Sequence, residues 1–172
     1  TAWLAAGLSQ EVPGTTIDRQ CGSSQQAVHF AAQAVMSGTM DVIVAGGVQT
    51  MTQIPISSAM IAAEPMGFKD PFSGSKGWVA RYGAEPPTQF KSAQMIADKW
   101  NLSRHDLEVF SLESHNRALR AIAEGRFKRE IIPLEGVEHD ETPRQSSLEK
   151  MAALDFLFGC DKVTAAVSSQ TC

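Results

Sequence analysis

Residues 15–27 read TTIDRQCGSSQQA, and this stretch decides the fold. Its first four residues favour a β-strand, and the alanine-rich run that begins at Ala27 favours a helix. Between the two stand Cys21 and the small residues Gly22 and Ser23. This order predicts a sharp turn from a strand into a helix, with the thiol of Cys21 at the turn.

A thiol at such a turn is suited to nucleophilic chemistry. The first turn of a helix has unpaired backbone N–H groups and the positive end of the helix dipole, and both favour thiolate over thiol. The thiolate is the form of cysteine that attacks a carbonyl carbon. We therefore expect Cys21 to be a nucleophile. The alternative is a small core hydrophobe, the ordinary role of a cysteine on an apolar strand.

The composition predicts a globular chain without a charge-driven partner. Of 172 residues, 43% are hydrophobic and 20% are charged, and the formal net charge is −4. This balance gives no reason to expect nucleic acid or an anionic membrane surface as partner, and no apolar run is long enough to span a bilayer. Cys21, Cys160 and Cys172 lack metal-ligand spacing, so we expect no metal site and a reduced, cytoplasmic protein.

The residues around Cys21 predict a βαβ unit. Residues 15–18 form the first expected strand, and residues 23–36 form an alanine-rich helix that ends at Ser37 and Gly38. Residues 42–45 read VIVA, a short apolar run typical of a parallel strand covered on both faces. Strand, helix and strand in this order make a right-handed crossover.

Residues 51–87 have no sustained hydrophobic period and are rich in methionine, glycine and proline. Ordinary connections are much shorter, so the segment is a long excursion from the core. Its aromatic residues predict that the excursion is packed, because disordered segments are poor in them.

The last part of the chain predicts helices and short strands. A helix over residues 90–100 is followed by a second that begins with a capping-box-like pair, Ser103 and Asp106, and closes at Gly125. The remaining expected elements are an edge strand at residues 131–134, a short helix at residues 147–154 and a strand at residues 163–172.

Four segments in the same order resemble the thiolase family. They read QCGSSQQAV at residues 20–28, DVIVAGGVQTMT at 41–52, SLEKM at 147–151 and VTAAVSS at 163–169. The likeness is greatest to bacterial degradative thiolases of steroid and fatty-acid breakdown, and residues 70–78 contribute to it.

The resemblance implies an α/β, thiolase-like layered fold, of which the chain holds part of the N-terminal half. Residues 1–50 would be a partial core with the βαβ unit and the nucleophile turn. Residues 51–162 would be an inserted loop domain that binds coenzyme A and pairs subunits into tetramers, and residues 163–172 a strand returning to the core. Both ends look cut, so we expect a fragment, and the family assembly implies a homo-oligomer.

The implied reaction is that of an acyl-CoA acetyltransferase. A 3-ketoacyl-CoA would be cleaved by a second coenzyme A into acetyl-CoA and a shortened acyl-CoA. Cys21 would attack the 3-keto carbon and hold the acyl group as a thioester. Its backbone N–H would donate to the oxyanion, and Gly22 would let the backbone approach the thioester closely. Coenzyme A is then a co-substrate, and no bound cofactor or metal is implied.

The resemblance also assigns residues to coenzyme A. Ser169 matches the family serine at the pantetheine arm, and Ala165 lies beside it in the sequence. Arg144 is the candidate for the nucleotide end, because a guanidinium suits phosphate and stacks on adenine. Ser147 is a further candidate at that end.

The chain departs from the family pattern in two respects. Thr88 and Gln89 stand where biosynthetic thiolases have a His-Met pair, which favours a different, bulkier acyl chain. The family's acid/base histidine, second catalytic cysteine and oxyanion asparagine have no match in this sequence.

Two alternatives to a thiolase activity stay open. The chain could be a non-catalytic module that binds coenzyme A and a partner subunit. It could also be a condensing enzyme of the ketoacyl-synthase type, which shares the turn at the cysteine. The Gly46-Gly47 turn and the segment with Ser169 argue against the second alternative.

Overall fold

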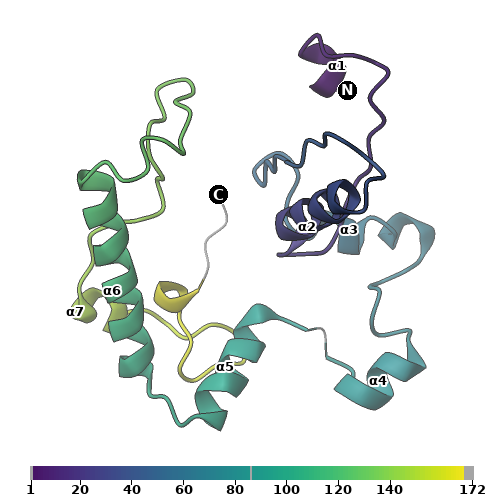
Figure 1. Cartoon of the computed structure of the whole chain (residues 1–172). Helices are drawn as coiled ribbons and strands as arrows, with labels where there is room; N and C mark the ends of the chain where they lie inside the picture. The colour runs from purple at the N-terminus through teal and green to yellow at the C-terminus, as the bar shows by residue number, and fades with distance from the viewer. Residues whose placement is uncertain (1, 86, 169–172) are drawn as a thin grey trace. The chain divides into compact units, whose positions relative to one another are not determined.

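The computed structural model describes residues 2–85 and 87–168, and the chain divides into two compact units between Thr50 and Met51 (Figure 1). The helices in the described residues, in chain order, are α1 (Ala2–Ala5), α2 (Ser23–Met36), α3 (Ser58–Ile61), the 3-10 helix η1 (Glu64–Met66), α4 (Lys76–Tyr82), α5 (Gln89–Lys99), α6 (Arg104–Ala123), α7 (Leu148–Ala152) and the 3-10 helix η2 (Ala165–Val167).

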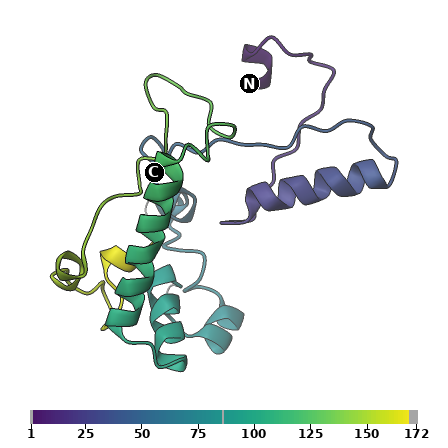
Figure 2. The ribbon, with the colours of Figure 1, turned by 60° about the vertical axis from the view of Figure 1, so that its left-hand side comes forward.

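The first unit is built around α2. The predicted helix is confirmed at both ends: Gly22 is the residue before its first turn, and the backbone N–H of Ser37 donates to the carbonyl of Gln33 at its end. Gly38 follows with φ +72°, a left-handed conformation that glycine adopts without strain. Figure 2 shows α2 joined to extended segments.

The predicted strands beside α2 are not confirmed. Residues 15–18 and 42–45 are extended but form no ladder with any residue that the structure describes. A β-strand exists through hydrogen bonds to a neighbouring strand, and its apolar side chains need a covered face. Val42 is 85% exposed and Val44 is 74% exposed, so the apolar run lacks both.

The excursion contains a packed aromatic cluster, as its composition predicts. The ring of Trp78 in α4 stacks at a tilt on Phe72, with centroids 4.7 Å apart, and on Tyr82, with centroids 4.6 Å apart. The carboxylate of Asp70 accepts hydrogen bonds from the Ser73 hydroxyl and from the backbone N–H groups of Ser73 and Phe72. These bonds lower the pKa of Asp70 and close the turn that leads into α4.

The boundaries of α6 follow from local chemistry, and the predicted capping box is confirmed. The Ser103 hydroxyl accepts from the backbone N–H of Asp106 at 3.1 Å, and the Asp106 carboxylate accepts from the backbone N–H of Ser103 at 2.8 Å. Gly125 follows the helix with φ +68°, as its position predicts. The α5 helix likewise begins at a cap, the hydroxyl of Thr88, which accepts from the N–H of Lys91.

The predicted edge strand at residues 131–134 is wrong. The structure instead has a tight turn in which Leu134 and Val137 exchange backbone hydrogen bonds of 3.2 and 2.9 Å. Glu135 and Gly136 between them have φ +50° and +88°, the pattern of a type I′ turn. Pro133 has no N–H to donate, so the ladder does not extend toward the N-terminus.

The core of the second unit lies where α6 meets α7 and η2 (Figures 1 and 2). Its buried side chains include apolar and polar residues in nearly equal number: Ala97, Met151, Val163, Ala166, Gln94, Glu108 and Thr164. Buried polar groups are costly unless they are hydrogen-bonded, so their partners matter for this fold.

The expected return strand at residues 163–172 is not what residues 163–168 form. Thr164 makes a single bridge with Phe156, and the chain then turns into η2. The reason is local: the fully buried Thr164 hydroxyl accepts the backbone N–H of Ala166 at 3.3 Å and caps this turn. Residues 169–172 lie outside the described residues.

In residues 2–85 and 87–168, no helix combines the length and the apolar character that a membrane span requires. The same residues contain no group of three histidine, cysteine, aspartate or glutamate side chains placed to hold a metal ion.

The cap of α6 gives a first prediction. Replacing Ser103→Ala removes the acceptor for the Asp106 N–H and is expected to lower the free energy of unfolding by about 1 kcal/mol. Denaturant titration measures this change. The matched control is Ser114→Ala, an exposed serine inside the same helix, expected to change stability by less than about 0.5 kcal/mol. Equal effects of the two variants would contradict the assigned cap.

The same cap predicts a pH dependence. The Ser103 hydroxyl and backbone N–H hold the pKa of Asp106 below its ordinary value of 3.8. A lowered folded pKa stabilises the fold above pH 3.8, and this contribution disappears as the pH falls through the lowered pKa. Titration of the Asp106 carboxyl by NMR should give a lower midpoint in the wild type than in Ser103→Ala. Identical midpoints would show that the serine does not stabilise the carboxylate.

Candidate active site

Cys21 has an unusual backbone at the start of α2. It lies directly before Gly22, its side chain is exposed, and its φ is +61°. A left-handed conformation in a residue with a Cβ costs of the order of 1–3 kcal/mol and persists only where the surroundings impose it. The predicted turn at the thiol is therefore present, and it is a strained turn of the kind found at functional sites.

Arg19 holds this turn on both sides of the cysteine. Its carbonyl accepts the backbone N–H of Gly22 at 2.7 Å, and its own N–H donates to the Ser23 hydroxyl at 3.0 Å. Its guanidinium donates to the side chain of Gln26, one turn into α2. These bonds fix the backbone of the residues flanking Cys21 at the start of α2.

Gly22 is not required by the geometry of the turn itself. Its φ is −124°, which any residue adopts, and a Cβ added there would lie 3.4 Å from the carbonyl oxygen of Arg19, an ordinary contact. The predicted reason for a glycine, close approach of a bulky thioester, remains a prediction.

The candidate residues for coenzyme A belong to the second unit, and Cys21 belongs to the first. The backbone N–H of Arg144 donates to Nδ1 of His115 in α6 at 3.3 Å, while the Arg144 side chain is exposed. The chain at Arg144 is thus held to α6, and its guanidinium is open to a ligand.

Ser147 is the N-cap of α7. Its hydroxyl accepts the backbone N–H of Lys150 at 3.3 Å, and its hydrogen bond to Glu149 is the main cause of a lowered pKa of that carboxyl. A capping hydroxyl of this kind orders the first turn of a helix. Ser147 therefore has a structural role in addition to the predicted role at coenzyme A.

Ala165 is the first residue of η2 and is exposed, whereas its neighbour Ala166 is buried. Ser169, the predicted contact to the pantetheine arm, lies outside the described residues. Because α7 and η2 both pack on α6, the structure brings Ser147 and Ala165 onto elements that share one support.

The sequence did not reveal Arg104 and Gln94, two polar residues that organise this support. The spacing of Arg104 and Glu108, four residues apart on α6, was the available signal for an ion pair. No pattern indicated the distant partners of Gln94, Asp161 and Lys162, which are 67 and 68 residues away in the sequence.

Comparison with known proteins shows the family. Residues 1–172 match the model of the thiolase N-terminal domain. The chain is 57% identical to a steroid 3-ketoacyl-CoA thiolase of Mycobacterium tuberculosis, over 98% of this chain and 42% of that protein. It is 36% identical to a beta-ketoadipyl-CoA thiolase of Pseudomonas aeruginosa, over 96% of this chain and 45% of that protein.

The chain therefore belongs to the thiolase family, and the resemblance to bacterial degradative thiolases is confirmed. Membership gives it the thiolase-like α/β fold at the level of fold class. The chain spans less than half the length of these curated relatives.

The exposure of the two described thiols gives a third prediction. Iodoacetamide at neutral pH should alkylate Cys21, which is exposed, faster than Cys160, which is half-buried. Peptide mapping by mass spectrometry at successive times measures both rates. The control variant Cys160→Ser should leave the Cys21 rate unchanged. Faster labelling of Cys160 would contradict the accessible turn.

Proposed function

We propose that this protein is an acyl-CoA acetyltransferase that cleaves 3-ketoacyl-CoA with coenzyme A, and that Cys21 is its nucleophile. The observation that supports this most directly is the exposed thiol of Cys21 on a strained backbone at the start of the 14-residue helix α2. An accessible thiol near unpaired N–H groups and the positive end of a helix dipole is favourable for attack on a carbonyl.

The proposed reaction has two halves. The Cys21 thiolate attacks the 3-keto carbon, and the tetrahedral oxyanion collapses with cleavage of the bond between C2 and C3. The leaving group, the C2 carbanion of acetyl-CoA, takes up a proton, and the acyl group stays on Cys21 as a thioester. The thiolate of a second coenzyme A then attacks this thioester, forms the shortened acyl-CoA and releases the Cys21 thiolate. Two easier steps replace one difficult step.

The backbone N–H of Cys21 is the proposed oxyanion donor. It donates to no group among residues 2–50 of the first unit, whereas the neighbouring N–H of Gly22 donates to Arg19. A preorganised donor of this kind is worth about 3–4 kcal/mol in the transition state. The proton on C2 has to come from an acid for which this sequence has no matching motif.

Coenzyme A is proposed to bind at Arg144, Ser147, Ala165 and Ser169. The exposed guanidinium of Arg144, on a backbone held by His115, supports the assignment of a phosphate or adenine contact. The exposure of Ala165 supports a contact to the pantetheine arm.

A bulky acyl group is the proposed substrate class. The relative at 57% identity is named a steroid 3-ketoacyl-CoA thiolase. Thr88 and Gln89 replace the His-Met pair of biosynthetic thiolases, and this replacement favours a bulkier acyl chain. The Thr88 hydroxyl has a structural role as well, because it caps α5.

The proposal includes the finer architecture. On the family resemblance, we propose residues 1–50 as a partial core in which residues 15–18 and 42–45 become strands on either side of α2, although they form no ladder among the described residues of this structure. Residues 51–162 are the loop domain, and residues 163–172 return to the core.

We further propose a homo-oligomer. Val42, Val44 and Val48, which is 91% exposed, flank Gly46 and Gly47 in the sequence and give this segment an apolar surface that favours covering by protein. The free thiols of Cys21 and Cys160 support the cytoplasm as the location.

The activity is tested by thiolysis assays on the full-length gene product. Cys21→Ser should lower the rate of acetyl-CoA release more than about a thousandfold, because the covalent route is lost. The matched control Cys160→Ser should retain the wild-type rate. A wild-type protein that binds coenzyme A but cleaves no 3-ketoacyl-CoA would instead be the non-catalytic module, and dependence on an acyl-carrier protein would indicate a condensing enzyme.

A further inference from the structure

The residues that link the two ends of the proposed coenzyme A site form one folded segment, residues 151–164. It begins at the last turn of α7, behind Ser147, and ends directly before Ala165 in η2. The segment folds back on itself, because the N–H of Leu157 donates to the carbonyl of Val163 at 2.9 Å and Phe156 bridges Thr164. Its two ends therefore lie at a defined separation from each other.

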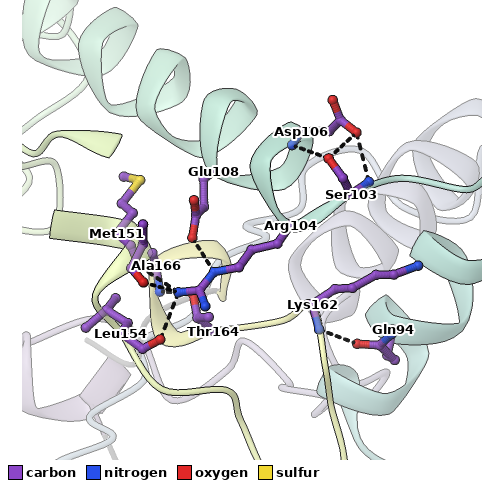
Figure 3. Close-up of polar contacts among 11 residues, drawn as sticks. Gln94, Ser103, Arg104, Asp106, Glu108, Met151, Leu154, Lys162, Thr164 and Ala166 are labelled. Atoms are coloured by element: carbon purple, nitrogen blue, oxygen red, sulfur yellow. Dashed lines mark hydrogen bonds and ion pairs between the residues drawn. The ribbon is translucent and has the colours of Figure 1, made fainter. Parts of the chain in front are cut away.

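Arg104, the first residue of α6, holds the beginning of the segment. Its Nη2 donates to the carbonyl oxygens of Met151, Ala152 and Leu154 at 3.0, 3.0 and 2.8 Å. Figure 3 shows the guanidinium between Glu108 and the carbonyls of Met151 and Leu154. The carbonyls of Met151 and Ala152 lie in the last turn of α7, where a cation also complements the helix dipole.

Glu108 keeps the guanidinium in this orientation. Its carboxylate accepts from Nε of Arg104 at 2.7 Å, and its side chain is only 4% exposed. The Cζ atom of the guanidinium also lies 4.8 Å from the centroid of the ring of Phe156, a residue of the same segment. A lysine at position 104 would keep the charge but would lose the planar fork that serves both partners.

Gln94, a buried residue of α5, holds the other end of the segment. Its Oε1 accepts the backbone N–H of Lys162 at 3.1 Å (Figure 3). The same oxygen accepts the backbone N–H of Asp161 at 3.2 Å, and Nε2 donates to the Asp161 carboxylate at 2.6 Å. Arg104 thus binds carbonyl oxygens at one end, and Gln94 binds N–H groups at the other. Both side chains satisfy backbone groups that no ladder satisfies, among them the carbonyl of the buried Met151.

We propose that Arg104 and Gln94 are positioning residues for coenzyme A: by fixing both ends of residues 151–164, they hold Ser147 and Ala165 in one binding arrangement before the ligand arrives. The inference rests on the proposed function, because it concerns the coenzyme A site of that reaction. Neither residue needs to contact the ligand, and their effect is exerted through α7 and η2. Preorganisation of this kind increases affinity by lowering the ordering cost of binding.

The test compares two thioesters in the full-length gene product. One substrate is a 3-ketoacyl-CoA, and the other is the same acyl group on N-acetylcysteamine, which lacks the nucleotide and most of the pantetheine arm. Arg104→Lys and Gln94→Met should each lower kcat/KM for the coenzyme A ester about tenfold more than for the short ester, as expected when binding energy is lost remotely from the reacting atoms. The matched control is Arg117→Lys, which alters an exposed pair with Glu113 on the same helix and should leave the ratio unchanged.

A merely structural role would lower both activities equally, and that result would overturn the inference. So would an unchanged ratio in variants that retain the wild-type circular dichroism. A wild-type protein that neither cleaves the coenzyme A ester nor binds coenzyme A by calorimetry would overturn the proposed function and this inference with it. If the wild type cleaves the coenzyme A ester but the ratio of the two kcat/KM values is unchanged in both variants, the inference is overturned and the proposed function stands.

A measurement on the wild type covers the case in which the variants do not fold. Hydrogen exchange without coenzyme A should be slow at the amides of Leu157, Asp161 and Lys162, because the segment is held before the ligand binds. Fast exchange that becomes slow only after coenzyme A is added would show that the ligand orders the segment, and it would overturn the inference.

Discussion

The second unit depends on the ion pair and the hydrogen bonds that the guanidinium of Arg104 makes. It neutralises the buried carboxylate of Glu108 and satisfies three carbonyl oxygens at the end of α7. A helix of five residues is too short to persist through its own hydrogen bonds, so α7 forms because both of its ends are capped, by Ser147 and by Arg104. Breaking a buried ion pair of this type costs about 3–5 kcal/mol, and the 25% exposure of the Arg104 side chain places the cost toward the lower end.

The contacts that stabilise the second unit also position α7 and η2, the elements of the proposed coenzyme A site. The ion pair fixes α7 on α6, and the buried residues Val163 and Thr164 fix the start of η2 on the same helix. Hydrogen bonds also hold the backbone in the first unit. There, Arg19 contacts Gly22, Ser23 and Gln26, and these contacts maintain the left-handed backbone of Cys21. In both units, polar side chains hold a backbone conformation that its own residues would not adopt, and the proposed ligand contacts follow from that conformation.

The features that the sequence predicted correctly depend on residues that are only a few positions apart in the chain. The capping box of Ser103 and Asp106 and the left-handed Gly125 are signals of this kind. The strand at residues 42–45 depends on pairing with distant segments, and its composition alone could not show whether a partner is present. The contacts of Arg104 with Met151 and of Gln94 with Asp161 cross 47 and 67 residues and follow no hydrophobic period, so sequence patterns did not reveal them. The position of Cys21 at the turn was predictable, whereas its φ of +61° was not.

The central claim is that Cys21 accepts an acyl group from a coenzyme A thioester. Its most direct test mixes the protein with a 3-ketoacyl-CoA in the absence of free coenzyme A, quenches the reaction with acid and maps the peptides by mass spectrometry. The account predicts that the peptide containing Cys21 gains the mass of the shortened acyl group and loses it again when coenzyme A is added. An enzyme that releases acetyl-CoA while this peptide stays unmodified, or that carries the acyl group on another residue, would contradict the account.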